Sequence, residues 1–227
     1  MAMGTGIFVV GDVHGCLHTF VDVLKRWNTE REMLVQVGDL VVGGNYSPEV
    51  VALARRLEQQ YPGQVVFLRG NHEQQVVEYF ERQMPNQWLR QGGSQMLHAY
   101  ARRGFSLAND VEWFNTMPLF WENNAVFISH AGVGPTDDPY NPRNPAGVVW
   151  YRGPLQHIGK LQVVGHVPVE EPTYSRLEHC WRIDTNARRG HKLSALRLDA
   201  EGTVLEIISI PVHAADFSPP SSDRPIS

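Results

Sequence analysis

The chain has 227 residues, of which 42% are hydrophobic and 19% are charged, so it is long enough to bury a full hydrophobic core as one domain. Its formal net charge of -4 argues against a protein that binds nucleic acid by neutralising phosphates. No apolar run approaches the roughly 20 residues of a membrane-spanning helix, and the two cysteines provide no disulfide framework. We therefore expect a cytoplasmic protein without a nucleic-acid or membrane partner.

The first third of the chain predicts strands that alternate with helices. Apolar runs that suit buried strands occupy residues 7–10, 33–37 and 65–68. Segments with helical spacing follow them at about 16–27, at about 47–60 and from about 73 onward. Ser47 and Pro48 are typical of an N-cap and the first helical position. The alternation predicts a parallel sheet with right-handed crossovers.

The rest of the chain predicts three further regions. Residues 83–121 are rich in aromatic side chains and favour a small helical cap, whereas residues 134–154 contain five prolines and favour an irregular loop. Residues 181–183, 193–198 and 204–210 have strand character and predict an antiparallel second sheet over the first. We expect one folded domain over residues 1–212 and a flexible C-terminal tail over residues 213–227.

Five short blocks, each placed directly after an apolar run, carry the candidate functional residues. They read GDVHG at 11–15, GDL at 38–40, GNHE at 70–73, SHAG at 129–132 and GHVP at 165–168. A glycine lets the backbone turn sharply after a strand, so each block is predicted at the carboxyl end of a strand, where open α/β sheets bind their ligands. The blocks supply six candidate metal ligands: Asp12, His14, Asp39, Asn71, His130 and His166.

These side chains form a donor set that suits two divalent cations. Any one Asp or Asn alone would favour a turn or a helix cap, but six such residues at strand ends favour a metal site. We expect Asp12 and His14 to hold one ion and Asp39 to bridge to a second ion. The second ion would be held by Asn71, His130 and His166. Mixed oxygen and nitrogen ligands favour Mn²⁺, with Fe or Zn²⁺ as alternatives, over Ca²⁺, and two such ions lower the pKa of a bridging water.

The order of the blocks resembles the calcineurin-like metallophosphoesterase superfamily, and within it the phosphoprotein phosphatase branch with its bacterial and phage serine/threonine phosphatases. The resemblance spans about residues 7–198, because further short matches lie at 88–93, 111–114, 150–152 and 183–185. It implies an α/β sandwich: two mixed β-sheets packed face to face, flanking helices, and a dinuclear metal site at the carboxyl ends of strands.

The resemblance also implies an activity and roles for single residues. His72 matches the histidine that protonates the leaving alkoxide, and Arg152 matches the arginine that binds the phosphate oxygens. A metal-bridging hydroxide would attack phosphorus in line. The implied substrate is a phosphoserine or phosphothreonine protein or peptide, or a small phosphoester. The alternatives are a diadenosine-polyphosphate hydrolase or phosphodiesterase on the same fold, and a non-catalytic phosphate-binding scaffold. The sequence leaves the oligomeric state open.

One block departs from the family pattern. Residues 38–44 read GDLVVGG, whereas the family pattern is GDLVDRG, so Val42 and Gly43 stand where an aspartate orients the catalytic histidine and an arginine binds phosphate. We expect weaker phosphomonoester binding or an altered substrate range. Four residues are possible substitutes for the missing pair: Arg69, Arg90, Arg143 and Glu73. Of these, Arg143 is predicted to bind substrate together with Arg152.

Overall fold

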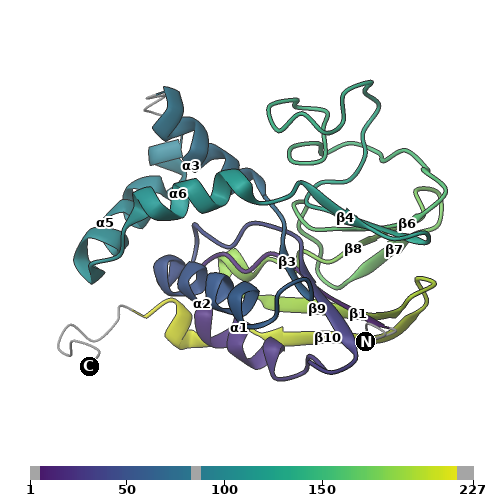
Figure 1. Ribbon diagram of the computed structural model, residues 1–227, viewed down its shortest axis with the longest axis horizontal. Helices are drawn as coiled ribbons and strands as arrows, with labels where there is room; N and C mark the ends of the chain where they lie inside the picture. The colour runs from purple at the N-terminus through teal and green to yellow at the C-terminus, as the bar shows by residue number, and fades with distance from the viewer. Residues whose placement is uncertain (1–5, 83–87, 219–227) are drawn as a thin grey trace.

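The computed structural model, which describes residues 6–82 and 88–218, contains two mixed five-stranded sheets packed face to face (Figure 1). The first sheet has the order β10-β9-β1-β2-β3, with β1 at Gly6–Val10, β2 at Glu32–Gln36, β3 at Val65–Phe67, β9 at Lys192–Asp199 and β10 at Val204–Pro211. The second has the order β4-β5-β6-β8-β7, with β4 at Phe120–Glu122, β5 at Val126–Ser129, β6 at Leu161–Val164, β7 at Thr173–Ser175 and β8 at Cys180–Arg182. The predicted fold class is confirmed.

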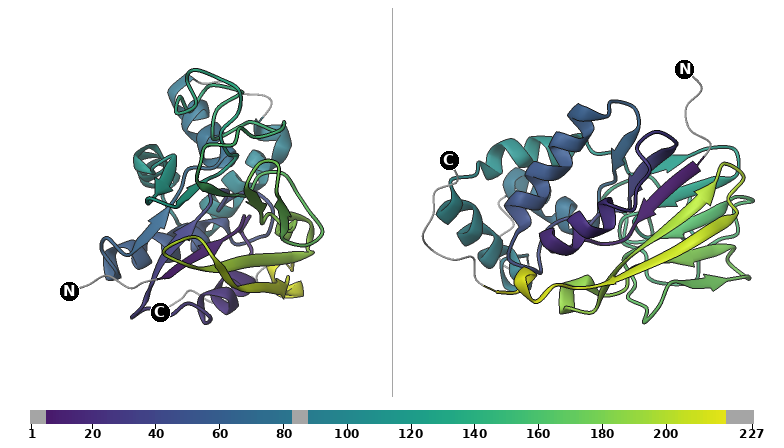
Figure 2. Two further views of the ribbon diagram at one scale, coloured as in Figure 1. Left: turned by 90° about the vertical axis from the view of Figure 1, so that its right-hand side faces the viewer. Right: turned by 90° about the horizontal axis from the view of Figure 1, so that it is seen from below.

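The helices fall into two groups, which Figure 2 shows from the side and from below. Helices α1 (Leu17–Leu24) and α2 (Ser47–Gln60) pack on the first sheet, on the face turned away from the second sheet. The other group contains α3 (Asn71–Arg82), α5 (Ser94–Arg103) and α6 (Leu107–Thr116). Three single turns complete the described elements: η1 (Leu89–Gly93), η2 (Ala187–Arg189) and η3 (Ala214–Asp216). None of the helices in the described ranges is long and apolar enough to cross a membrane.

Strand β1 shows why the first sheet is buried on both faces. Phe8 and Val10 point into the core shared with α1 and α2, whereas Ile7 and Val9 point into the core between the two sheets. Successive side chains of a strand alternate between faces, so a strand covered on both sides is a continuous apolar run. The same pattern identified β2 and β3, and the two covered faces hold the strand ends in place.

The assignment of the C-terminal strands to a second antiparallel sheet was wrong for two of them. Strand β9 pairs antiparallel with β1, and β10 pairs with β9, so both extend the first sheet. The second sheet is built from residues 120–182 instead, with β5, β6 and β8 parallel. Alternation of side chains identifies a strand but does not say which neighbour it pairs with. The edge of β1 opposite β2 was free to accept β9.

Two local predictions also differ from the structure. Ser47 is the first residue of α2 rather than its N-cap, and its hydroxyl accepts a hydrogen bond from the Val42 main-chain N at 3.1 Å. Residues 213–218 are folded onto α1: the fully buried Asp216 carboxylate accepts hydrogen bonds from the main-chain N of His18 and Thr19. Residues 219–227 of the expected tail lie outside the described residues, as do residues 83–87 of the expected cap. Residues 134–154 contain no helix or strand, as predicted.

Candidate metal centre

The strand ends of both sheets meet at one place and bring the five blocks together. Asp12 and His14 follow β1, and Asp39 follows β2, while Asn71 begins α3 just after β3. From the second sheet, His130 follows β5 and His166 follows β6. Because β1, β2 and β3 are parallel, and β5 and β6 are parallel, their carboxyl ends lie on common edges of the two sheets.

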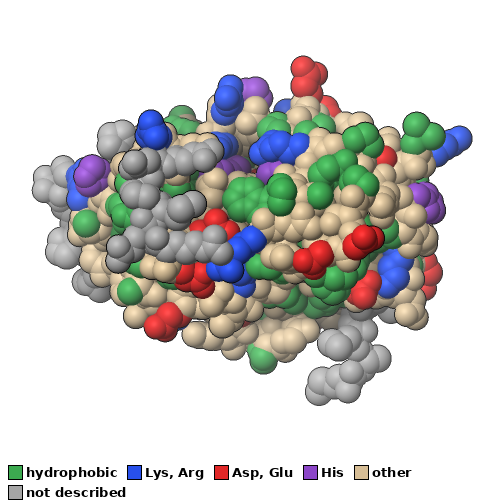
Figure 3. All heavy atoms as spheres, turned by 90° about the horizontal axis from the view of Figure 1, so that it is seen from above, with side chains coloured by type: hydrophobic (Ala, Val, Ile, Leu, Met, Phe, Trp, Pro, Cys, Tyr) green, Lys and Arg blue, Asp and Glu red, His purple; other side chains and the backbone are tan. Residues whose placement is uncertain are grey.

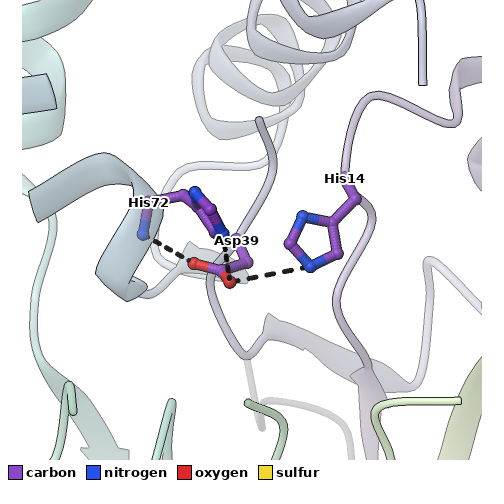
Figure 4. A group of neighbouring side chains, drawn as sticks. All are labelled: His14, Asp39 and His72. Carbon is purple, nitrogen blue, oxygen red and sulfur yellow. Dashed lines mark hydrogen bonds and ion pairs between the residues drawn. The ribbon is translucent and has the colours of Figure 1, made fainter. Parts of the chain in front are cut away.

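Asp39 lies between two histidines of the cluster. Its Oδ2 is 3.6 Å from His14 Nε2, and its Oδ1 is 3.5 Å from His130 Nε2. Figure 4 shows the carboxylate facing the His14 and His72 imidazoles. Asp12 approaches the same His14 nitrogen, with Oδ2 at 3.9 Å. The two carboxylate oxygens of Asp39 therefore face different ligands, which is the arrangement a bridging carboxylate requires.

The second group of predicted ligands converges on His130. Its Nε2 lies 3.0 Å from Asn71 Oδ1 and 3.1 Å from His166 Nδ1. These three side chains come from α3 and from the ends of β5 and β6, so they are far apart in sequence. All six residues predicted to hold metal are buried and are brought into one cluster.

Each of the three histidines is anchored through the nitrogen that points away from the cluster. Metal-binding histidines commonly donate their second ring N–H to a carbonyl or carboxylate, which fixes the ring orientation. The anchoring contacts are His14 Nδ1 to Val42 O at 2.9 Å, His130 Nδ1 to Val37 O at 3.1 Å, and His166 Nε2 to Trp150 O at 3.1 Å. The other nitrogen of each ring is then unprotonated, and its lone pair can bind a cation.

Burial and charge prepare these side chains for cations. Burial, followed by the charges of Asp184 and Asp39, raises the pKa of Asp12 well above its usual value. Burial, followed by the charge of Glu73, does the same to the pKa of Asp39. Burial is also the main cause that lowers the pKa of His14 to about 4 and that of His166 to about 3. The imidazoles are therefore neutral near pH 7, and the crowded carboxylates gain from a nearby positive charge.

The backbone at the cluster adopts conformations that ordinary side chains avoid. Three of the predicted ligands have positive φ angles: 49° at His14, 58° at Asp39 and 67° at His166. Such conformations are uncommon outside glycine and concentrate at functional sites. The surrounding sheets therefore hold the cluster in a geometry that local preference would not select.

Taken together, these features fit two divalent cations. Neutral ring nitrogens, one amide oxygen and two carboxylates are ligands that suit Mn²⁺, Fe or Zn²⁺. Among the described residues, two groups of three have ligand atoms within 4.8 Å of one another: Asp12 with Asp39 and His130, and His14 with Asp39 and His72. Asp39 belongs to both groups, in agreement with a bridging position.

The two residues predicted to act on the phosphate lie at this cluster. His72 is in the first turn of α3; its main-chain N donates to Asp39 Oδ1 at 2.9 Å, and its Nε2 is 3.8 Å from Asp39 Oδ2. Arg152 is exposed and donates from Nη1 to the main-chain O of His166 at 3.3 Å. Figure 3 shows histidine and basic side chains close together near the middle of the face that is uppermost in Figure 1.

Described contacts give Arg143, Arg69 and Glu73, all possible substitutes for the missing Asp–Arg pair, other partners. Arg143 forms ion pairs with Glu78 and Glu81, six and nine residues beyond His72 on α3. Arg69 donates hydrogen bonds to the Gln74 side chain and to the main-chain O of Asn115 and Met117. Glu73 accepts hydrogen bonds from four main-chain N–H groups, those of Gly70, Asp39, Leu40 and Val41. Arg90 lies in η1. The prediction that Arg143 binds substrate therefore finds no support in its contacts.

Sequence reasoning missed Arg188, which reaches the cluster from η2. Its Nη1 lies 3.1 Å from His72 Nε2, and its Nη2 donates to Gln91 O at 2.7 Å. No block of the family pattern includes this residue. The available signal was its position, since it lies three residues after the matched segment 183–185, in a turn that leads away from a strand end.

Comparison with known proteins agrees with this geometry. Residues 6–198 match the family model for calcineurin-like phosphoesterases. A curated relative, bis(5'-nucleosyl)-tetraphosphatase PrpE of Anoxybacillus flavithermus, is 26% identical over 243 residues, which cover 93% of this chain and 98% of the relative. Serine/threonine-protein phosphatase 1 of Salmonella typhimurium is 34% identical over 133 residues, which cover 55% of this chain and 58% of that protein.

A solved structure extends the agreement to the whole fold. The crystal structure of a candidate diadenosine tetraphosphatase superposes with a TM-score of 0.65 at 22% identity, covering 94% of this chain and 96% of the other. At this identity the likeness concerns the fold alone. The family match over residues 6–198, together with the clustered ligands, is decisive. The chain belongs to the calcineurin-like phosphoesterase family and is a metal-dependent phosphoric ester hydrolase.

Proposed function

We propose that this enzyme hydrolyses phosphoanhydrides of the dinucleoside polyphosphate class, and that aryl phosphates are its accessible small substrates. One observation carries the proposal: the ring of His72 is not arranged to give a proton to a leaving group. Arg188 Nη1 lies 3.1 Å from His72 Nε2, and a guanidinium can only donate, so Nε2 must accept in this contact. The ring proton is therefore on Nδ1.

The other ring nitrogen supports the same conclusion. Among the described residues, none provides a hydrogen-bond partner for the buried Nδ1 of His72. The resemblance implies an aspartate at position 42 to orient this histidine, but the chain has Val42, which is 2% exposed. Without a carboxylate to stabilise a protonated ring, and with a guanidinium beside it, His72 is a poor general acid.

Leaving groups differ in how much they need such an acid. Phosphoserine releases an alkoxide, whose parent alcohol is nearly as weak an acid as water, with a pKa of roughly 15.7. An anhydride releases a phosphate oxygen, whose pKa is roughly 6, so it can depart without a proton. A site with a poor general acid therefore favours the anhydride over the alkyl ester.

Divalent cations at the cluster, for which we propose Mn²⁺, would neutralise charge on the phosphoryl oxygens and supply an ionised water. The residues of the chain do the rest. Asp39 and the three anchored histidines are metal ligands held in fixed positions. Arg152, which is exposed beside them, binds a phosphate oxygen. Arg152 is held toward the cluster by its hydrogen bond to His166 O.

Hydrolysis of phosphoserine or phosphothreonine in proteins is the second candidate. It is supported by the 34% identity to serine/threonine-protein phosphatase 1 of Salmonella typhimurium over 133 residues. The match to that protein covers 58% of its length, whereas the match to the tetraphosphatase covers 98% of the relative. The full-length match favours the first candidate.

The test is a comparison of kcat/KM for diadenosine tetraphosphate, p-nitrophenyl phosphate, bis(p-nitrophenyl) phosphate and a phosphoserine peptide, all with Mn²⁺. We expect diadenosine tetraphosphate to be preferred over the peptide by at least about 10², the usual minimum contribution of a general acid. The variant His72→Gln is expected to slow the anhydride reaction less than about 10-fold. Asp39→Asn, which removes the bridging carboxylate, is the control for contaminating activity. Equal or faster hydrolysis of the peptide would overturn the proposal.

A further inference from the structure

Arg188 is placed by a turn that is itself firmly held. Ala187, the first residue of η2, is fully buried, and the Cys16 thiol lies 3.5 Å from its main-chain O. Asn186 begins the turn in a left-handed conformation, with φ 64° and ψ 42°. The position from which the Arg188 side chain leaves the backbone is therefore fixed by the core rather than by a mobile loop.

The stem of Arg188 passes over Gly43, the position where the family pattern has its phosphate-binding arginine. A Cβ built on Gly43 would lie 3.1 Å from Arg188 Cγ and 2.8 Å from His14 O. A side chain at position 43 and the observed course of Arg188 would therefore compete for the same space. Glycine at position 43 therefore leaves the space that the Arg188 side chain occupies.

The guanidinium ends beside the predicted reaction centre. Its Nη1 is 3.1 Å from His72 Nε2, and that nitrogen is 3.8 Å from the bridging carboxylate oxygen of Asp39. Its charge is close enough to His14, Asp39 and Asp184 to interact with each of them. A guanidinium has five N–H donors, and its two described hydrogen bonds leave donors available for phosphate oxygens.

We propose that Arg188 binds the oxygens of the scissile phosphoryl group together with Arg152, in place of the arginine that is missing at position 43. The inference deepens the proposed function, because it names a substrate-binding residue of the same site. Two arginines on different elements would then hold the phosphate: Arg152 from the segment between β5 and β6, and Arg188 from the turn between β8 and β9. The planar fork of a guanidinium suits this role better than an ammonium group.

The experiment measures binding of inorganic phosphate by isothermal titration calorimetry, with the protein saturated with Mn²⁺ and its bound manganese counted. Arg188→Met keeps the stem over Gly43 but removes the guanidinium, and it should weaken phosphate binding about 10- to 100-fold. Arg188→Lys should fall between this variant and the wild type. Arg189→Met is the matched control, because Arg189 is the exposed neighbour in the same turn, and it should bind phosphate as the wild type does.

Each other outcome contradicts the inference. Unchanged phosphate affinity in Arg188→Met, with its manganese retained, would show that Arg188 does not touch the phosphoryl group. Loss of manganese from that variant would assign Arg188 to the support of the metal ligands instead. Phosphate binding does not depend on which substrate the enzyme prefers. A wild type that does not hydrolyse diadenosine tetraphosphate would therefore contradict the proposed function. The phosphate titration would still test this inference.

Discussion

Gly165 lies so close to Asp12 that a Cβ on the glycine would be 1.9 Å from Asp12 Oδ1. Gly165 begins the GHVP block after β6, and Asp12 follows β1, so this contact joins the two sheets at the metal cluster. The main-chain N of His166 adds a hydrogen bond to Asp12 Oδ2 at 3.1 Å. The glycine of this block is therefore required by the approach of the Asp12 carboxylate.

Gly165→Ala is expected to displace the Asp12 carboxylate and to weaken binding of Mn²⁺ at least about 10-fold, the scale seen when groups that orient metal ligands are changed. Calorimetric titration with Mn²⁺ checks this. Gly104→Ala is the control: Gly104 has φ 71°, and no atom of the described residues lies within 4 Å of its Cβ position. It should lower stability by about 1 kcal/mol without changing the affinity for Mn²⁺. Equal Mn²⁺ affinity in both variants would contradict the close-approach argument.

Val42→Asp should partly restore phosphomonoester chemistry. Val42 has φ 69°, a conformation that aspartate tolerates better than a β-branched residue. The family pattern implies that a carboxylate here pairs with the histidine, and the buried Nδ1 of His72 has no partner among the described residues. Such a pair would stabilise the protonated ring. We expect hydrolysis of a phosphoserine peptide to rise at least about 10-fold relative to diadenosine tetraphosphate. The control is Val42→Asn, because asparagine has the shape of aspartate without its charge. An equal gain in both variants would show that the charge is not the cause.

Stability without metal should depend on Asp39 in a direction set by its pKa. Because burial, followed by the charge of Glu73, raises this pKa, the folded chain holds the Asp39 proton to a higher pH than the unfolded chain does. The ionised form therefore costs stability as the pH rises. In EDTA, Asp39→Asn should melt at a higher temperature than the wild type at pH 8, and the difference should shrink toward pH 5.

His14 contributes with the opposite sign, since burial and then the charge of Arg188 lower its pKa to about 4. Its contribution is present above the ordinary value of 6.5 and is lost as the pH falls through about 4. His14 contacts Asp39, so its contribution can differ between the two proteins where it titrates. At pH 8 the imidazole is neutral in both, and the comparison there reports on Asp39. A wild type that is the more stable of the two at pH 8 in EDTA would refute the argument.

The strand ends and the meeting of the six candidate ligands could be predicted from the sequence because both depend on short-range signals. A buried β-branched run followed by glycine and a polar residue identifies a strand end, as at Val10 and Asp12 or at Val164 and His166. The pairing of β9 with β1 could not be predicted, because alternation is the same for every possible neighbour. Arg188 was missed for a related reason: its route over Gly43 depends on tertiary packing that no local pattern records.

The position of Glu73 illustrates the same limit at the site. A glutamate beside His72 was a reasonable substitute for the missing orienting carboxylate. In the structure its two oxygens accept hydrogen bonds from main-chain N–H groups of the loop after β2, including those of Asp39 and Leu40 at 2.8 and 2.9 Å. It therefore shapes the loop that carries Asp39, the predicted bridging ligand, and it does not bind the ring of His72.

The most direct test of the account is the electron paramagnetic resonance spectrum of the Mn²⁺-loaded protein, recorded together with its manganese content. Six predicted ligands, with Asp39 as the bridge, predict two ions per chain at a separation of roughly 3.5–4 Å. Two Mn²⁺ ions this close give an exchange-coupled spectrum. Asp39→Asn should lose the coupling. A wild-type spectrum of isolated Mn²⁺ ions, or a coupled spectrum that survives in Asp39→Asn, would contradict the account.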